Sequence, residues 1–251
     1  MNKWKFSLMA VPFVFMIWFV VSAKYPAYIV PSPVDVFHEG VVQWNKGEIQ
    51  THILLSLKRL VLGFVLSACM AFLIGILAGA FRPFRLFLMP LVSFFQATPP
   101  MAWAPLLVIF LGLGDAPMIS VIMIASFFPI LMNVIQGMNM IPESHIRAAK
   151  SLGATGWKLA FYVYLPEIIP AAISGIYVGF AISWRSLVAA EMIGGNGGIG
   201  YFISFNGQTG NSSAVILGIL IIGFLALFMD FLFLKPLHNR FAGWALRNKN
   251  E

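Results

Sequence analysis

The sequence predicts an all-α membrane protein that crosses the bilayer with six helices. Only 10% of its 251 residues are charged and 60% are hydrophobic, and the mean hydropathy is +0.88. Soluble domains carry about a quarter charged residues, so this composition excludes an ordinary soluble protein. The apolar residues also occur in long runs, and a bilayer core about 30 Å thick requires roughly 20 such residues in one helix.

Six apolar runs are long enough to be membrane spans. The first run follows Lys3 and Lys5, as the apolar core of a signal peptide would. It is long, however, and no small-residue cleavage site follows it, so we predict a retained helix. The third run is too long for one straight span and carries four prolines between positions 90 and 105. We expect it to be kinked or broken near QATPPMAWAP, where protein or a water-filled cavity must cover the irregular backbone. The predicted spans of this single domain, residues 1–251, are 6–23, 60–81, 86–113, 118–138, 168–187 and 214–234.

The placement of lysines and arginines predicts that both termini face the cytoplasm. In that orientation 11 of the 16 cationic residues lie on the inner side, as the positive-inside rule requires. The other five are Lys24, Lys46, Lys58, Arg59 and Arg185. Because the cations fall at the ends of apolar runs rather than in one basic patch, we expect membrane lipid and not nucleic acid as a partner.

The cysteine and the histidines give no sign of redox or metal chemistry. Cys69 is the only cysteine, so an intrachain disulfide is impossible. The four histidines lie far apart, outside the strongly apolar runs and without metal-ligand spacing. The sequence therefore predicts no metal site.

A short interfacial helix is predicted between the first two spans, in PSPVDVFHEGVVQW. Ser32 suits the N-cap, Pro33 suits the first helical position, and the carboxylate of Asp35 favours the positive end of the helix dipole. We expect an apolar side made of Val36, Phe37 and Val41.

The longest internal loop, residues 139–167, contains the sequence IRAAKSLGATGWKLAFYVYLP. We expect one short helix that begins near Pro142 and ends at Gly153, where glycine permits a tight turn, and a second that runs from Trp157 to Tyr164 and stops at Pro166. The residues alone leave two interpretations open. The segment is either a connecting loop with ordinary inner-side cations or a rigid elbow on which another protein docks, with Trp157 as an anchor.

This segment resembles the cytoplasmic signature loop of ATP-binding-cassette (ABC) importer permeases, whose pattern is Glu-Ala-Ala, three residues, Gly, and an apolar stretch ending in Leu-Pro. Ala148, Ala149, Gly153, Leu165 and Pro166 match that spacing, whereas Arg147 replaces the usual Glu. Further segments resemble the nitrate, sulfonate and taurine branch of these permeases. They are VPSPVDVF, SLKRLVLGF, PPMAWAPLLVIFLGLGDAP, FFPILMNVIQGM and LVAAEMIGGNGGIGYFI.

The resemblance implies the type I importer permease fold and a place in the bacterial cytoplasmic (inner) membrane. It further implies a homodimer, a cytoplasmic ABC ATPase dimer that binds ATP and Mg, and an extracytoplasmic substrate-binding protein. The chain has no phosphate-binding loop of its own, so we expect it to bind no cofactor and not to be an enzyme. The ATPase-coupling residues implied by the resemblance are Arg147, Ala148, Ala149, Lys150, Gly153, Ala154, Trp157, Leu165 and Pro166.

Polar groups and breaks within the spans indicate where a solute could pass. Arg185 suits an oxyanion if it faces inward; the alternatives are that it reaches the outer interface or pairs with Glu191. Asn133 is either a path residue or a helix-packing residue. We expect Gly194–Ile203 to be a flexible external loop, which forms a gate, contacts the binding protein or simply turns the chain. The path candidates are Pro100, Met101, Trp103, Asn133, Trp184, Arg185 and Glu191.

The predicted function is import of a small anion such as a sulfonate, taurine or nitrate. The alternative cargo within the same family is a pyrimidine-type vitamin precursor or an aromatic acid. An ion-gradient-driven transporter would require a midplane ionisable relay or paired broken helices. An intramembrane enzyme would require convergent catalytic groups, and neither pattern is present in the sequence.

Overall fold

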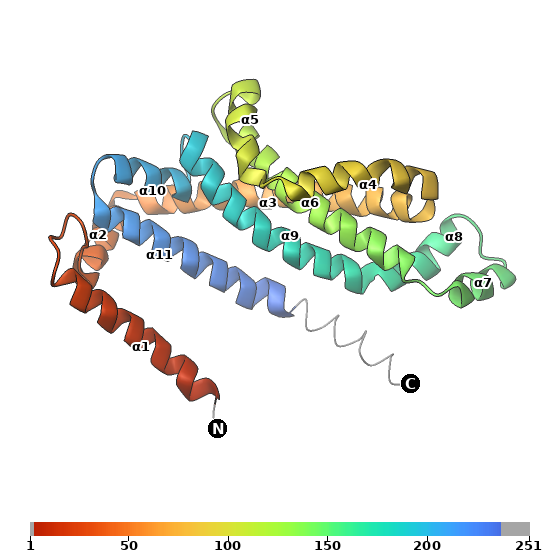
Figure 1. The fold of residues 1–251 in the computed structure, drawn as a ribbon, viewed down its shortest axis with the longest axis horizontal. Helices are drawn as coiled ribbons and strands as arrows, with labels where there is room; N and C mark the ends of the chain where they lie inside the picture. The colour runs from red at the N-terminus through yellow and green to blue at the C-terminus, as the bar shows by residue number, and fades with distance from the viewer. Residues whose placement is uncertain (1–2, 237–251) are drawn as a thin grey trace.

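The computed structural model describes the backbone of residues 3–236 and the side chains of residues 12–232, 235 and 236. Within these limits the chain is helical and contains no β-strand. Three long helices form its centre and lie side by side (Figure 1): α3 (Glu48–Ala80), α6 (Asp115–Asn139) and α9 (Leu165–Gly194). The predicted all-α class is therefore confirmed.

Glycines bring the three central helices close together. A Cβ added to Gly75 of α3 would lie 2.6 Å from Val134 of α6, and one added to Gly175 of α9 would lie 2.8 Å from Asn133. Such approaches are too short for a real side chain, so only glycine allows these backbones to meet. Close contact of this kind is how helices pack where lipid removes the hydrophobic driving force.

Several of the other helices gather at one end of this centre, which we call the α10 end. Helix α2 (Pro33–Lys46), α10 (Ile199–Gln208) and α11 (Ser212–Met229) lie there, and α1 (Lys3–Ser22) leads away from α2 (Figure 1). Gly218 of α11 packs against Ile203 of α10, and Gly40 of α2 against Leu217 of α11. A π-helical turn, η3 (Asp230–Leu234), continues α11.

Helix α2 has the predicted cap but not the predicted apolar side. Ser32 and Asp35 form a reciprocal capping box, and Pro33 occupies the first turn. Val36 is buried, whereas Phe37 and Val41 are exposed. The three side chains do not share one environment, because Val36 lies on the side of α2 that packs against the protein, with Gly40 and Gln43, and Phe37 and Val41 do not.

The third apolar run is broken, as its prolines predicted. Helix α4 (Arg82–Ala97) is followed by a 3-10 turn, η1 (Pro100–Trp103), and by α5 (Ala104–Leu111), and the two halves meet at an angle of 91°. Pro99 and Pro100 have no N–H to offer to the last carbonyls of α4. The Thr98 hydroxyl instead donates to the Phe94 carbonyl over 2.7 Å.

The prediction that a helix stops at Pro166 is wrong. Helix α8 (Trp157–Leu159) passes through a π-helical turn, η2 (Ala160–Tyr164), directly into α9. Pro166 cannot donate within an α-helix, and the wider π turn, in which the Leu165 amide donates to the Ala160 carbonyl, accommodates it without ending the helix.

The described residues account for up to five of the six predicted membrane spans. Four helices of the described chain are long and apolar enough to cross a membrane, and a fifth is obtained if the bent pair of α4 and η1–α5 counts as one span. In α1, the apolar stretch Pro12–Ser22 is shorter than a span, and the side chains before it lie outside the described residues.

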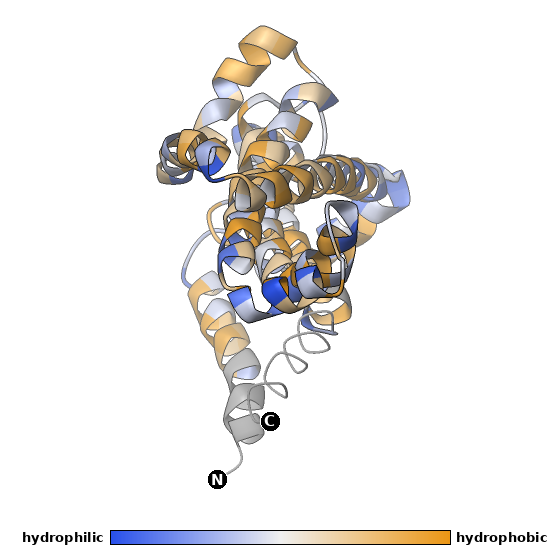
Figure 2. Cartoon of the chain, turned by 90° about the vertical axis from the view of Figure 1, so that its right-hand side faces the viewer, coloured by the Kyte–Doolittle hydropathy of each residue, from blue (hydrophilic) through white to orange (hydrophobic). Residues whose placement is uncertain are grey.

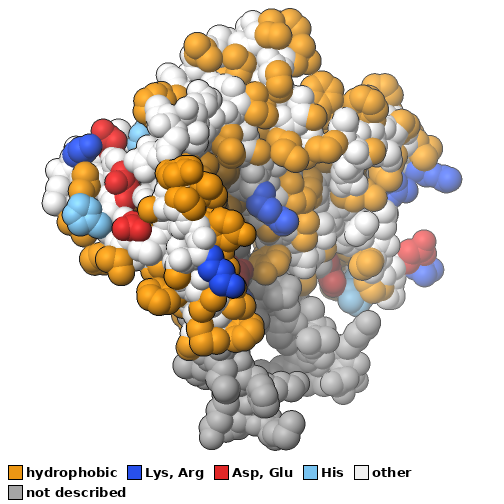
Figure 3. Space-filling model, turned by 60° about the vertical axis from the view of Figure 1, so that its left-hand side comes forward, with side chains coloured by type: hydrophobic (Ala, Val, Ile, Leu, Met, Phe, Trp, Pro, Cys, Tyr) orange, Lys and Arg blue, Asp and Glu red, His pale blue; other side chains and the backbone are white. Residues whose placement is uncertain are grey.

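The surface suits lipid contact. Hydrophobic residues extend along most of the helical body, and hydrophilic ones gather at helix ends and connections (Figure 2). The face seen in Figure 3 is mostly hydrophobic, with charged side chains in a few small groups. Large apolar side chains such as Phe224 and Leu227 on α11 are exposed on the protein surface, where lipid is a more favourable neighbour than water.

Candidate translocation pocket and coupling elbow

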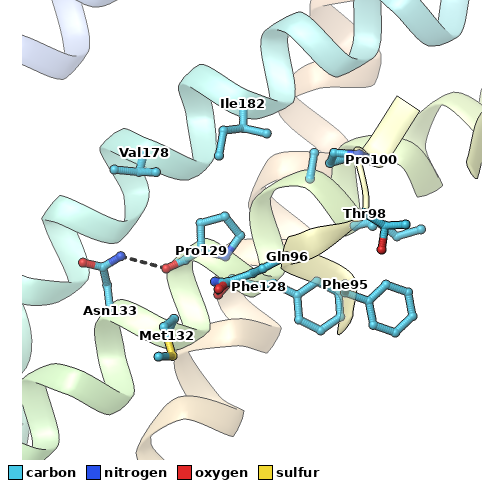
Figure 4. A pocket seen from close by; sticks show the side chains of 12 residues that line it. Phe95, Gln96, Thr98, Pro100, Phe128, Pro129, Met132, Asn133, Val178 and Ile182 are labelled. Carbon is cyan, nitrogen blue, oxygen red and sulfur yellow. Dashed lines mark hydrogen bonds between the residues drawn. The ribbon is translucent and has the colours of Figure 1, made fainter. Parts of the chain in front are cut away.

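A pocket of about 340 Å³ lies beside the break between α4 and η1 (Figure 4). Its walls come from the end of α4, the middle of α6 and one face of α9, and its size falls within the range of small-molecule sites. The stacked rings of Phe95 and Phe128, with centroids 4.6 Å apart, form one wall. The lining residues are Phe95, Gln96, Thr98, Pro100, Ile124, Ala125, Phe128, Pro129, Met132, Asn133, Val178 and Ile182.

The polar groups of this pocket are uncharged. The Gln96 amide donates to the Phe128 carbonyl over 3.3 Å, and the Asn133 amide donates to the Pro129 carbonyl over 2.9 Å. Each amide keeps its oxygen and a second N–H for other partners. Pro129 also leaves the Ala125 carbonyl without its helical donor. The pocket therefore offers an apolar body with a few neutral hydrogen-bonding groups.

A cation lies next to this pocket on α9. Arg185 follows Ile182 by three positions and Val178 by seven, and this spacing places all three on one helix face. The Arg185 Nε donates to the Ala181 carbonyl over 2.9 Å. The side chain is exposed and lines a second groove of about 280 Å³ between α9 and α11, whose other wall includes Asp230. Asp230 itself pairs with Lys235 over 3.0 Å.

At the opposite end of the molecule, which we call the α7 end, the predicted elbow is present. Helix α7 (Glu143–Ser151) ends in a Schellman motif: the Ala154 amide donates to the Ala149 carbonyl and the Gly153 amide to the Lys150 carbonyl, both over 2.9 Å. Gly153 has φ +82°, the left-handed conformation that glycine adopts without strain. The turn expected at Gly153 is confirmed.

The elbow is attached to the helices on both sides of it. Ile146 and Ala149 pack against the hydrophobic core between α3, α6 and α9. Nδ1 of His145 lies 2.8 Å from Oε1 of Glu167, which links α7 to the start of α9. Because α6 leads into α7 and α8 continues into α9, a displacement of the elbow moves the two helices with the most extensive mutual contact.

Most of the predicted coupling residues lie on the surface of the elbow. Trp157 of the predicted set is 65% exposed, and the neighbouring Leu152, which was not among the predicted residues, is 89% exposed, although both are large and apolar. Exposed apolar side chains beside cations are typical of a surface that another protein covers. The other exposed members of the set are Arg147, Ala148, Lys150, Gly153 and Pro166, and Ala149, Ala154 and Leu165 are half-buried.

The predicted path residues other than Arg185 lie in different surroundings. Pro100 and Asn133 line the pocket, and Trp103 supports it through its ring contact with Phe95. Met101 is exposed outside the lining. Trp184 and Glu191 are buried within this chain, at 4% and 1% exposure.

Glu191 pairs with Arg59 rather than with Arg185, the alternative raised from the sequence. Arg59 Nη1 lies 3.0 Å from Glu191 Oε1, and both side chains are fully buried. Sequence reasoning placed Arg59 only among the outer cations. The missed signal is that a charged residue inside an apolar helix needs a buried partner, and each of these two residues lies in such a helix.

The expected loop over Gly194–Ile203 is wrong for the second half of the segment, because α10 begins at Ile199. Gly198 and Gly200 pack against Glu191 so closely that an added Cβ would lie within 2.1 Å and 2.7 Å of its atoms. The segment folds around this carboxylate and leads directly into α10.

A helical membrane protein with a pocket at a broken span and a rigid polar elbow between two packed helices fits the membrane subunit of a transporter. Residues 71–234 match the family of binding-protein-dependent transport system inner membrane components. The chain belongs to this family, that of ABC transporter permeases.

Two relatives are similar along most of their length. The taurine transport system permease protein of Escherichia coli is 32% identical over 193 residues, which cover 77% of this chain and 70% of the relative. The nitrate import permease protein of Synechococcus elongatus is 30% identical over 237 residues, 89% of this chain and 85% of the relative. The resemblance to the nitrate and taurine branch is therefore confirmed, and the family implies a separate ATPase subunit and a substrate-binding protein.

Proposed function

We propose that this chain forms, with a second copy of itself, the membrane path of an ATP-driven importer for a small solute with an anionic group. The ATPase dimer, which holds ATP and Mg, docks on α7, and the binding protein delivers the solute at the α10 end. In this arrangement the α7 end and both termini face the cytoplasm.

The observation that carries the proposal is the capped elbow between α6 and α8–α9. A helix that ends in a Schellman motif and is linked by His145 to Glu167 passes a displacement on to α6 and α9, whereas a disordered loop would not. The exposed surface of Leu152 and Trp157 offers the apolar anchor that a protein partner buries first.

The positions of Arg185 and the pocket support an anionic cargo. An arginine on an exposed face of a membrane helix is costly against lipid, so such residues face a protein interior or a water-filled path. Its planar fork pairs with the oxygens of sulfonates, nitrate and carboxylates. Taurine and nitrate, the cargoes in the names of the two relatives, both carry such oxygens.

Reconstitution tests the proposal directly. Proteoliposomes would contain the permease and its ATPase, with ATP inside and the binding protein with labelled taurine, nitrate or an aromatic acid outside. We expect uptake that requires both ATP and the binding protein. Uptake driven by a proton gradient without ATP would instead establish a secondary transporter.

Replacement of Arg185 tests the anion site. Loss of a charged hydrogen-bond partner costs about 1.5–3 kcal/mol, so we expect Arg185→Gln to lower uptake at limiting solute by about 10-fold to 150-fold. Arg185→Lys retains the charge and should lose less. Lys46→Gln, an exposed cation on α2, serves as the control and should transport normally. Unchanged uptake by Arg185→Gln would remove Arg185 from the path.

The pocket favours an aromatic acid as a second candidate cargo. The stacked Phe95 and Phe128 rings and the neutral amides of Gln96 and Asn133 suit a flat body, with its acid group toward Arg185. A thermal-shift screen of the binding protein against sulfonates, nitrate, pyrimidines and aromatic acids distinguishes these classes.

A further inference from the structure

Arg59 connects four parts of the structure through one guanidinium group. Its Nε donates to Asp115 Oδ1 at the start of α6 over 2.8 Å, and its Nη1 donates to Glu191 Oε1 on α9 over 3.0 Å. Nη1 also donates to the Gly197 carbonyl over 2.6 Å, and Nη2 donates to Asn196 Oδ1 over 3.0 Å. The α3 side chain that makes all these bonds is fully buried.

The first amides of α10 are bound by side chains of α3 and α9, Glu191 among them. The Gly200 amide donates to Glu191 Oε2 over 3.0 Å, the Ile199 amide to Ser56 Oγ over 2.9 Å, and the Gly198 amide to His52 Nδ1 over 3.1 Å. Helix N-termini leave such amides without helical partners. Here α3 and α9 supply them, so the start of α10 is fixed to the central helices.

The glycines of the α9–α10 connection are required by this arrangement. Gly198 has φ +100°, and a Cβ there would lie 2.1 Å from Glu191 Oε1; one at Gly200 would lie 2.2 Å from the Val188 carbonyl oxygen. At position 198 a larger residue would displace the Glu191 carboxylate, and at position 200 it would collide with the α9 backbone at Val188. We call Ser56, Arg59, Asp115, Glu191 and Asn196, with this connection, the Arg59 cluster.

The position of the Arg59 cluster suggests what it does. It lies at the α10 end, where α3, α6 and α9 meet the layer formed by α2, α10 and α11. Together with the bond between the Gly198 amide and His52, the cluster provides the polar attachment of α10 to the central helices. Stability alone does not explain a buried ion pair, since apolar residues of similar volume often serve equally well or better.

We propose that Arg59 and Glu191 are positioning residues of the transport cycle. They clamp α10 to α3, α6 and α9, so that a displacement applied at α7 moves the α10 end of the path in step with the α7 end. This inference rests on the proposed function, because it needs the elbow to be the point where the ATPase acts.

The test removes the clamp without leaving an unpaired charge in the core. Arg59→Met and Glu191→Gln are combined, and the Gln oxygen can still accept from Gly200. The full transporter is assayed in proteoliposomes for solute taken up per ATP hydrolysed, for thermal stability, and for hydrogen exchange at the amides of residues 198–200. We expect the double variant to retain more thermal stability than either single variant. Its uptake per ATP should be at least about 10-fold lower than that of the unmodified complex, as coupling energies of this kind allow. Hydrogen exchange at the start of α10 should be faster.

Two further variants separate positioning from folding. Ser67→Ala removes a different bond between α3 and α6, from Ser67 Oγ to the Met123 carbonyl, and should leave uptake per ATP unchanged. Asn196→Ala removes one bond of Arg59 at an exposed residue. It should fold even if the double variant does not, and should lower uptake per ATP by a smaller factor.

The outcomes distinguish this inference from the proposed function. Wild-type uptake per ATP in the folded double variant, or in Asn196→Ala with accelerated exchange, would show that the Arg59 cluster is only structural. Absence of ATP-dependent uptake in the unmodified complex would instead contradict the proposed function itself.

Discussion

The contact between Gly75 on α3 and Val134 on α6 allows a sharp test of the central packing. In Gly75→Ala the new Cβ would lie 2.6 Å from Val134 Cγ1 and 2.8 Å from Val134 Cβ. Val134 is β-branched and fully buried, so it has little rotational freedom with which to move aside. The two helices must separate, or their side chains must adopt strained positions.

The expected magnitude follows from two opposing effects. Overpacking a buried site costs about 1–3 kcal/mol, while replacing Gly by Ala within a helix contributes about 1 kcal/mol of helix propensity. Gly223 of α11 gives the matched control, because a Cβ there meets no atom within 4 Å. The free energies of unfolding of Gly75→Ala and Gly223→Ala should therefore differ by about 1–3 kcal/mol, with Gly75→Ala the less stable.

Thermal unfolding of the purified protein measures this difference. For a chain of this size 1 kcal/mol corresponds to about 2–4 °C, so the midpoints should lie about 2–12 °C apart. Val134→Ala removes the nearer clashing atom, Cγ1, and keeps Cβ, so the double variant Gly75→Ala, Val134→Ala should be more stable than the sum of the single changes by at least about 0.5 kcal/mol. Equal midpoints for the two glycine variants, or strict additivity, would refute the described contact.

Two other predictions concern the elbow and the cap of α2. A non-glycine residue at the φ of Gly153 costs about 1–2 kcal/mol of backbone strain, and a Trp side chain there would also occupy the exposed surface of the elbow. Gly153→Trp should therefore weaken ATPase docking and uptake while the membrane helices stay folded, with a midpoint of thermal unfolding lower by at most about 8 °C, and Gly153→Asn should be milder. Normal docking of the Trp variant would disprove the coupling role. The hydrogen bonds from Ser32 lower the pKa of Asp35, so the cap is complete at neutral pH and is lost as the pH falls through that lowered value. Hydrogen-exchange protection in the first turn of α2 should fall in acid. Ser32→Ala should weaken this dependence, because the backbone amide at position 32 still donates to Asp35, and Asp35→Asn should remove it; an acid effect that persists in Asp35→Asn would contradict the assignment.

Sequence patterns were sufficient for the local features. The apolar runs predicted the helices, the prolines near Thr98 predicted the broken span, and Gly153 predicted the turn after α7. Each depends on interactions within a few residues: backbone hydrogen bonds that proline cannot make, a backbone conformation that glycine adopts freely, and the length of helix that a bilayer requires. The elbow was accordingly recognised in its correct place.

The same local reasoning failed where distant residues compete. Pro166 is a helix stop by local rules, yet η2 widens to pass it because α9 is packed against α6 on the far side. The glycines after Gly194 indicate a loop by composition, yet α10 begins at Ile199, and the Glu191 carboxylate occupies the space that a side chain at Gly198 would need.

By itself, the sequence determined that the chain is a bundle of membrane helices with a broken third run and a polar elbow, because these follow from hydrophobic length and local backbone chemistry. Only the tertiary structure decided that Arg59 pairs with Glu191, 132 positions away, and that the pocket gathers its lining from α4, α6 and α9. A buried charge requires a partner wherever packing can supply one, and the choice of partner depends on which helices meet.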